Sequence, residues 1–234
     1  MIFKWITVVL FFTIVLAFTN SQHTKQLVSF QKDNIEISEQ TFLNREILFE
    51  FIDKSDLISD NVSCHTFNLN NLEQYIEKHP LIKNAEVFAS QKGVLRVNID
   101  PRKAIVRIIT DSSTYYLDED MKIMPTSHEY TARVLVVSGD VSLQHHKQIF
   151  NFLGIIAKSK FWKSQITQLY FINNEVILIP RVGDQRVHFG LLTNISNKLD
   201  NLYQFYMQAM PIKGWQTYSD ISLKYSNQLV CTKK

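Results

Sequence analysis

The sequence contains few of the residues that characterise several common protein classes. Among 234 residues there are six glycines, five prolines and two cysteines. The low glycine and proline content excludes collagen-like structure and long low-complexity linkers. Two cysteines far apart in sequence, Cys64 and Cys231, exclude a disulfide framework and leave a single bridge open. Basic and acidic residues nearly balance, 25 against 22, so the chain lacks the positive charge typical of nucleic-acid binding.

The residues that are present indicate a folded protein. Hydrophobic residues make up 45% of the chain and aromatic residues 12%, enough to bury a core. The length suits one large domain or two small ones.

Residues 2–18 form an almost continuous apolar run in which Lys4 is the only charge. As a helix this run would extend roughly 25 Å, the short end of what crosses a bilayer. A cleaved signal peptide is the alternative, but residues 17–19 (Ala-Phe-Thr) form a poor cleavage site. We therefore predict a transmembrane signal anchor over residues 1–19, with a cytoplasmic N-terminus. A polar linker over residues 20–32 follows outside the cytosol.

The pattern over residues 33–101 predicts a first domain with the element order β-α-α-β-β. Short strands are expected at 34–38, 85–89 and 94–100, where apolar residues alternate. Thr41 is expected to cap the first helix, and Asn68 or Asn70 the second. The second helix should end at His79, because Pro80 cannot continue it.

Residues 102–234 predict a second domain with a mixed sheet and two helices, which makes the fold class α+β. Helices are expected at about 142–160 and after Asn194, each with one apolar face. Asn173 and Asn174 tolerate positive φ and predict a hairpin between strands 166–172 and 175–180. The remaining strands are expected at 104–110, 114–117, 122–124, 134–137, 186–189, 218–225 and 228–232.

No motif for catalysis or for binding a metal, cofactor or small molecule occurs in the sequence. There is no glycine-rich phosphate loop and no nucleophile elbow. His145 and His146 are adjacent, so on a helix they point about 100° apart and cannot readily share a metal. Asp118 and Asp120 begin like a calcium loop, but the glycine of such a loop is missing. We expect a non-catalytic protein, while a periplasmic enzyme of unrecognised type remains an alternative.

The chain ends in a predicted strand, and a terminal strand often forms the edge of a sheet. An edge exposes unpaired backbone groups that can accept a strand from another protein. Lys233 and Lys234 would then act as charged guards against uncontrolled pairing. A strand that merely completes the sheet is an equally open interpretation.

Three stretches of the sequence resemble the FtsQ (DivIB) family of bacterial cell-division proteins, in particular its Bacteroidetes members. The first, residues 72–100, reads LEQYIEKHPLIKNAEVFASQKGVLRVNID and is similar to the end of a POTRA domain. The second, residues 101–125, contains PRKAIVRI and YYLDEDMKIMP and resembles the entry into the family's β domain. The third, residues 214–234, reads GWQTYSDISLKYSNQLVCTKK and is similar to the family's C-terminus.

This resemblance implies a divisome scaffold of the inner membrane and division septum without enzymatic activity. A POTRA-like domain would span 33–101 and an FtsQ-type β domain 102–234, both periplasmic. FtsB/FtsL-like coiled-coil proteins would dock on the last strands by strand addition, and FtsK- and FtsW-like proteins are further candidate partners. Another POTRA-containing envelope binding module, such as an outer-membrane transport partner, is the alternative.

The resemblance also implies which residues bind the partner, and we expect Tyr225 and Val230 to provide the main side-chain contacts. The matching positions are Tyr225, Asn227, Gln228, Leu229, Val230, Cys231 and Thr232.

Overall fold

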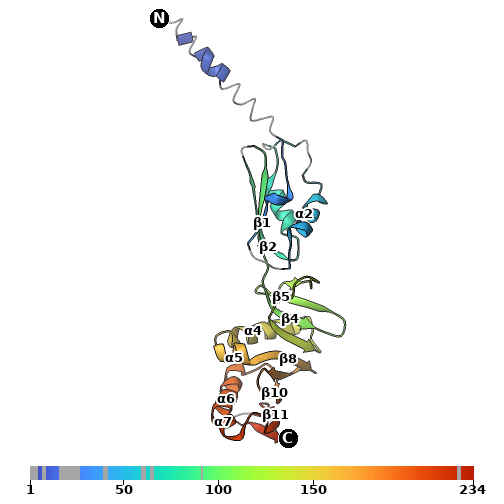
Figure 1. Ribbon diagram of the computed structural model, residues 1–234, viewed down its shortest axis with the longest axis vertical. Helices are drawn as coiled ribbons and strands as arrows, with labels where there is room; N and C mark the ends of the chain where they lie inside the picture. The colour runs from blue at the N-terminus through green and yellow to red at the C-terminus, as the bar shows by residue number, and fades with distance from the viewer. Residues whose placement is uncertain are drawn as a thin grey trace. The chain divides into compact units, whose positions relative to one another are not determined.

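The computed structural model describes residues 5–6, 9–15, 27–38, 42–58, 62–63, 66–90, 92–225 and 228–234. The chain divides into two compact units, residues 1–102 and 103–234 (Figure 1). Both units combine helices with a sheet, which confirms the predicted α+β class.

The predicted anchor falls mostly outside the described residues, which include only 5–6 and 9–15 of it, in helical conformation. Within the described part of the chain, no helix has both the length and the apolar character that a membrane crossing requires.

The first unit contains a three-stranded sheet with the order β1-β3-β2. β1 pairs parallel with β3, and β2 pairs antiparallel with β3. The β-α-α-β-β order predicted from the sequence is present, whereas its assignment as a POTRA domain stays a prediction. The elements are a 3₁₀ turn at Lys32–Asn34, β1 (Ile35–Ile37), α2 (Arg45–Asp53), α3 (Leu69–Ile76), β2 (Ile82–Ala89) and β3 (Leu95–Pro101).

The helix boundaries of the first unit differ from the prediction at two points. α2 begins after Asn44, whose side chain accepts a hydrogen bond from the Ile47 amide at 2.8 Å, while Thr41 lies outside the described residues. α3 is capped by Asn68 as predicted, but it ends at Ile76 rather than at His79. A proline disfavours helical backbone at the residue before it, and the chain has already left the helix when it reaches Pro80.

The second unit contains a nine-stranded mixed sheet with the order β12-β11-β10-β9-β8-β7-β4-β5-β6. Neighbours pair parallel in β4/β7, β7/β8 and β10/β11, and antiparallel elsewhere. The strands are β4 (Ala104–Ile109), β5 (Thr114–Asp118), β6 (Ile123–Met124), β7 (Leu135–Gly139), β8 (Ile166–Ile172), β9 (Glu175–Pro180), β10 (Arg186–Gly190), β11 (Tyr218–Ser222) and β12 (Val230–Lys233).

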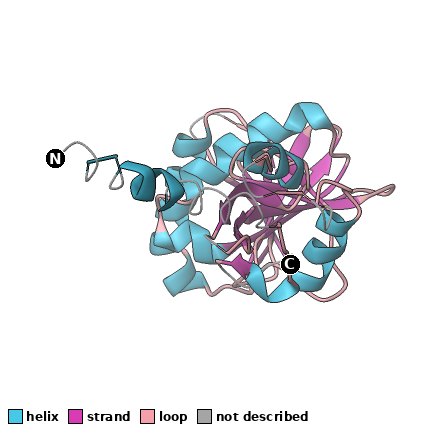
Figure 2. Ribbon diagram, turned by 90° about the horizontal axis from the view of Figure 1, so that it is seen from above, coloured by secondary structure: helices cyan, strands magenta, loops and turns pink. Residues whose placement is uncertain are grey.

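Four α-helices among the described residues of this unit connect the parallel strands. They are α4 (His146–Ile156), α5 (Lys160–Gln165), α6 (Ile195–Gln208) and α7 (Met210–Lys213), and a 3₁₀ turn, Leu143–His145, precedes α4. Figure 2 colours these helices cyan and the strands magenta. All four helices contribute buried side chains to one apolar cluster with the sheet.

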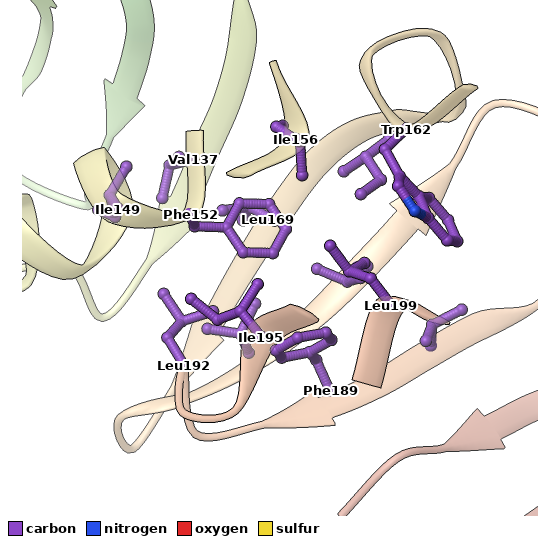
Figure 3. Packing of buried hydrophobic residues seen from close by; sticks show 14 of the residues in the cluster. Val137, Ile149, Phe152, Ile156, Trp162, Leu169, Phe189, Leu192, Ile195 and Leu199 are labelled. Atoms are coloured by element: carbon purple, nitrogen blue, oxygen red, sulfur yellow. The ribbon is translucent and has the colours of Figure 1, made fainter. Parts of the chain in front are cut away.

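One row of directly paired residues shows which face of the sheet the helices cover. The row crosses seven strands and consists of Ile108, Val137, Leu169, Leu178, Val187, Ile221 and Cys231. Directly paired residues point to the same face of a sheet, and all seven contact the apolar cluster. Figure 3 shows part of this packing, in which the rings of Phe152 and Phe189 meet edge to face at 5.8 Å.

The prediction of a single helix over 142–160 is wrong. α4 ends at Ile156, and α5 starts after Ser159, whose side chain accepts a hydrogen bond from the Trp162 amide at 3.4 Å. The break lets Trp162 bury itself in the cluster. Asn194 precedes α6 as predicted, but it adopts left-handed backbone at φ 50° and forms no side-chain cap. The second unit therefore has more helices than the two predicted.

Candidate partner-binding strand at the sheet edge

β12 is the last strand in the order of the large sheet, and no further strand of the described residues pairs with it. It runs antiparallel to β11, with Ser222 opposite Val230 and Asp220 opposite Thr232. The outer side of β12 is therefore an edge of the kind that can accept an added strand. β12 begins at Val230, two residues later than the predicted strand 228–232, and ends at Lys233.

The side chains of β12 alternate between the two faces of the sheet. Cys231 points to the helix-covered face and is half-buried, and burial raises the pKa of its thiol. Leu229, just before the strand, also packs against the cluster. Val230 and Thr232 point to the opposite face, where Val230 is 45% exposed. Cys231 is free, while Cys64 lies outside the described residues.

The segment before β12 leaves the ladder earlier than the sequence predicts. β11 ends at Ser222, so the prediction of a strand reaching Tyr225 is wrong. The Leu223 amide donates to the His188 carbonyl at 2.9 Å, and Lys224 forms an ion pair with Glu175 of β9. The Leu223 amide thus completes the parallel pairing of β11 with β10, and Lys224 contacts β9.

The structure brings only some of the predicted site residues together. Tyr225 lies in the loop before β12 with 57% of its surface exposed, and Gln228 is also exposed there. Asn227 lies outside the described residues. Of the expected contacts, Val230 therefore lies on the edge strand itself and Tyr225 in the loop that leads to it.

The end of the chain is held in place by Lys234. Its amide donates to the Thr217 carbonyl at 3.2 Å, and its ammonium group reaches Asp184 at 3.1 Å and Gln216 at 2.9 Å. The role of Lys233 and Lys234 as charged guards stays a prediction. The ammonium group of Lys234 also ties the end of β12 to neighbouring segments, which positions the edge strand.

A cluster of charged groups fixes β11, on which β12 rests. Asp220 lies 2.8 Å from the imidazole of His188 and 3.1 Å from the Arg186 guanidinium. The hydrogen bond with His188, followed by smaller effects of Ser219 and Arg186, lowers the pKa of Asp220 to about 2. Local sequence could not have revealed this cluster, since Asp220 lies 32 residues after His188 on a separate strand.

Two other sheet edges among the described residues, β2 and β6, are less open than β12. In β2, the Val87 amide donates to the Glu73 carboxylate at 2.8 Å, and the Ala85 amide donates to Glu77 at 3.3 Å. Both glutamates extend from the region of α3, so side-chain oxygens already occupy these amides. The opposite edge of the large sheet is β6, which is only two residues long.

The two histidines that could suggest chemistry have separate hydrogen-bond partners. His145 is buried, with Nδ1 accepting from the Ser142 amide at 3.0 Å and Nε2 2.8 Å from Asn174. His146 Nε2 lies 2.8 Å from the Tyr115 hydroxyl, and burial lowers its pKa. Both imidazoles fix the start of α4 against the sheet.

The acidic turn that follows β5 is closed by its own hydrogen bonds. Buried Asp118 accepts hydrogen bonds from the amides of Asp120 at 2.9 Å and Lys122 at 2.7 Å, which closes the turn. Cys64 and His65 lie outside the described residues. Within the described part of the chain, no group of three histidine, cysteine or acidic side chains could hold a metal ion.

The fold and the site define an α+β protein whose larger sheet ends in a strand, β12, whose outer side pairs with no other strand of the described residues. The family described as FtsQ/DivIB, C-terminal related, matches residues 103–232, more than half of the chain. The chain belongs to this FtsQ/DivIB-related family, as the resemblance predicted. Membership supports a role in cell division, in a family whose proteins are generally non-catalytic. A comparison with curated protein sequences finds no significant match.

Proposed function

We propose that the protein is a non-catalytic scaffold of bacterial cell division, which recruits partners by accepting a strand at β12. The proposed partners are FtsB/FtsL-like coiled-coil proteins, with FtsK- and FtsW-like proteins as further ones. The observation that carries the proposal is the free edge of β12, combined with membership of the division family. Backbone hydrogen bonds to the edge would provide affinity, and outward side chains would provide specificity.

The proposal includes the placement of the chain. Residues 1–19 would anchor it in the inner membrane with the N-terminus in the cytoplasm. A POTRA-like domain over 33–101 and the FtsQ-type domain over 102–234 would then lie in the periplasm at the septum. The apolar run at residues 2–18 and the family match over 103–232 support this arrangement. A fluorescently tagged full chain should concentrate at mid-cell during division, and a uniform membrane distribution would contradict it.

The partner site is tested by co-purifying the full chain with the FtsB-like protein of the same organism. Val230→Glu places a charge on the outward face of the edge strand and should reduce recovery of the partner about tenfold or more. Tyr225→Ala should also weaken binding, because an exposed aromatic side chain is a typical anchor of an interface.

Ile123→Glu is the matched control for this experiment. Ile123 is 50% exposed and lies on β6, the opposite edge of the same sheet. This variant should bind the partner like the unchanged chain. If the Val230→Glu and Ile123→Glu variants recover the same amount of partner, β12 is not the binding site.

Strand addition also predicts protection of backbone amides, which an interface made only by side chains does not. Amide hydrogen exchange over residues 230–233 should slow when the partner binds, because an added strand pairs with the outer backbone groups of β12. Protection confined to other parts of the chain would argue against strand addition.

A further inference from the structure

The second unit contains a groove that has no part in the proposed strand addition. Its volume is about 750 Å³, and it lies where parallel strands β4, β7 and β8 begin, far along the sheet order from β12. One wall is a face of α4, formed by Phe150, Leu153, Gly154 and Ala157. These residues follow the i, i+3, i+4, i+7 spacing of one helix face and cover about 10 Å.

The groove combines an apolar interior with a positively charged rim. Its floor comes from the starts of the three strands and is aliphatic except for Thr167. Arg133, Lys163 and Arg181 surround it. Among the described residues, no acidic side chain lines the groove. All three basic residues are exposed, and neither Arg133 nor Lys163 forms an ion pair with another described residue. The groove therefore favours an apolar ligand that carries negative charge.

Gly154 leaves open space in the groove, and the fold does not require a glycine at this position. A Cβ atom at this position would meet nothing within 4 Å. Its backbone is helical, so no positive φ requires a glycine, and glycine weakens a helix relative to alanine. The missing side chain deepens the groove at the centre of the α4 wall, which permits close approach by another chain.

We propose that this groove binds an acidic amphipathic helical segment of another protein. The apolar stripe of such a helix would lie along the α4 wall, as amphipathic helices do in apolar grooves. Carboxylates beside the stripe would face the rim. The three cations come from separate segments around the groove, an arrangement that matches several carboxylates along a peptide better than a single lipid head group. This second surface is independent of strand addition at β12.

A displayed library of 16-residue helical peptides, selected against the full chain, tests the proposal. Selected peptides should carry apolar residues at i, i+3, i+4 and i+7 with aspartate or glutamate beside them. Gly154→Trp fills the groove and should weaken their binding tenfold or more, as should Lys163→Glu, which reverses one rim charge. Gln148→Trp, on an exposed part of α4 outside the groove, is the matched control and should bind normally.

The outcomes separate this proposal from the one for β12. Val230→Glu should leave peptide binding unchanged, whichever way the division partner responds. Peptides without an acidic bias, or binding that tolerates Gly154→Trp, would overturn the proposal. Oleate provides a second test: saturable binding of oleate blocked by Gly154→Trp, with no peptide selected, would assign the groove to a fatty acid instead.

Discussion

Gly139 at the end of β7 allows a sharp test of the sheet arrangement. Its φ is +91°, and a Cβ atom there would lie 2.2 Å from the carbonyl oxygen of Phe171 on β8. Gly139→Ala must therefore strain the backbone and push β7 away from β8. Left-handed backbone costs a non-glycine residue about 1–2 kcal/mol.

The displacement adds a second cost, because the same Phe171 carbonyl accepts a hydrogen bond from the Asp140 amide at 3.0 Å. Losing that bond costs about 0.5–1.5 kcal/mol. Gly139→Ala should therefore lower the free energy of unfolding by about 2–3 kcal/mol. For a unit of this size, that corresponds to a fall in Tm of about 10 °C.

Urea unfolding of the full chain, followed by tryptophan fluorescence, measures this effect, since Trp162 is buried in the second unit. Gly154→Ala is the matched control, because that glycine has helical backbone and open space around its Cβ position. It should stabilise the unit by up to about 1 kcal/mol. Equal effects of the two substitutions, or a loss below about 0.5 kcal/mol for Gly139→Ala, would refute the reasoning.

Three further predictions concern burial, charge and hydrogen bonding. Burial lowers the pKa of His146, so the second unit should lose stability in urea titrations as pH falls from about 6.5 through the lower folded-state pKa. His146→Gln should flatten this slope; an unchanged slope would contradict it. Phe152→Ala should cost about 3–5 kcal/mol of unfolding free energy because the ring is fully buried. The exposed Phe150→Ala on the same helix should cost far less, and similar losses would argue against the packing of α4. Glu73→Ala removes the acceptor of the Val87 amide, whose hydrogen exchange should accelerate about fivefold or more, and unchanged protection would exclude that bond.

Local sequence patterns predicted most elements of this fold. The hairpin of β8 and β9 forms at the predicted residues, with positive φ at Asn173 and Asn174. Turn residues and alternation act over a few positions, so such elements can be recognised without knowledge of the rest of the chain. The break between α4 and α5 falls where the apolar spacing of α4 stops, at residues 158–160, and Ser159 caps the next helix, so local sequence does carry a signal for it that the prediction of one helix overlooks.

The candidate binding strand was predicted only in part. The resemblance of residues 214–234 to the family's C-terminus predicts the site at residues 225–232, and a terminal strand is often an edge. The sequence predicts Tyr225 in a strand, but β11 ends at Ser222, and Lys224 beyond it forms an ion pair with Glu175 of β9. That ion pair joins residues 49 positions apart, beyond the range of any local pattern.

The sequence by itself determined the class of the protein, the periodic faces of its helices and strands, and the family to which it belongs. Tertiary structure alone decided the order of the nine strands, and with it the position of β12 at the edge. It also decided that Cys231 faces the core while Val230 faces outward, and that Gly154 opens a groove with a basic rim. The physical reason is that these features depend on which distant segments pair and pack, whereas sequence patterns report only the preferences of neighbouring residues.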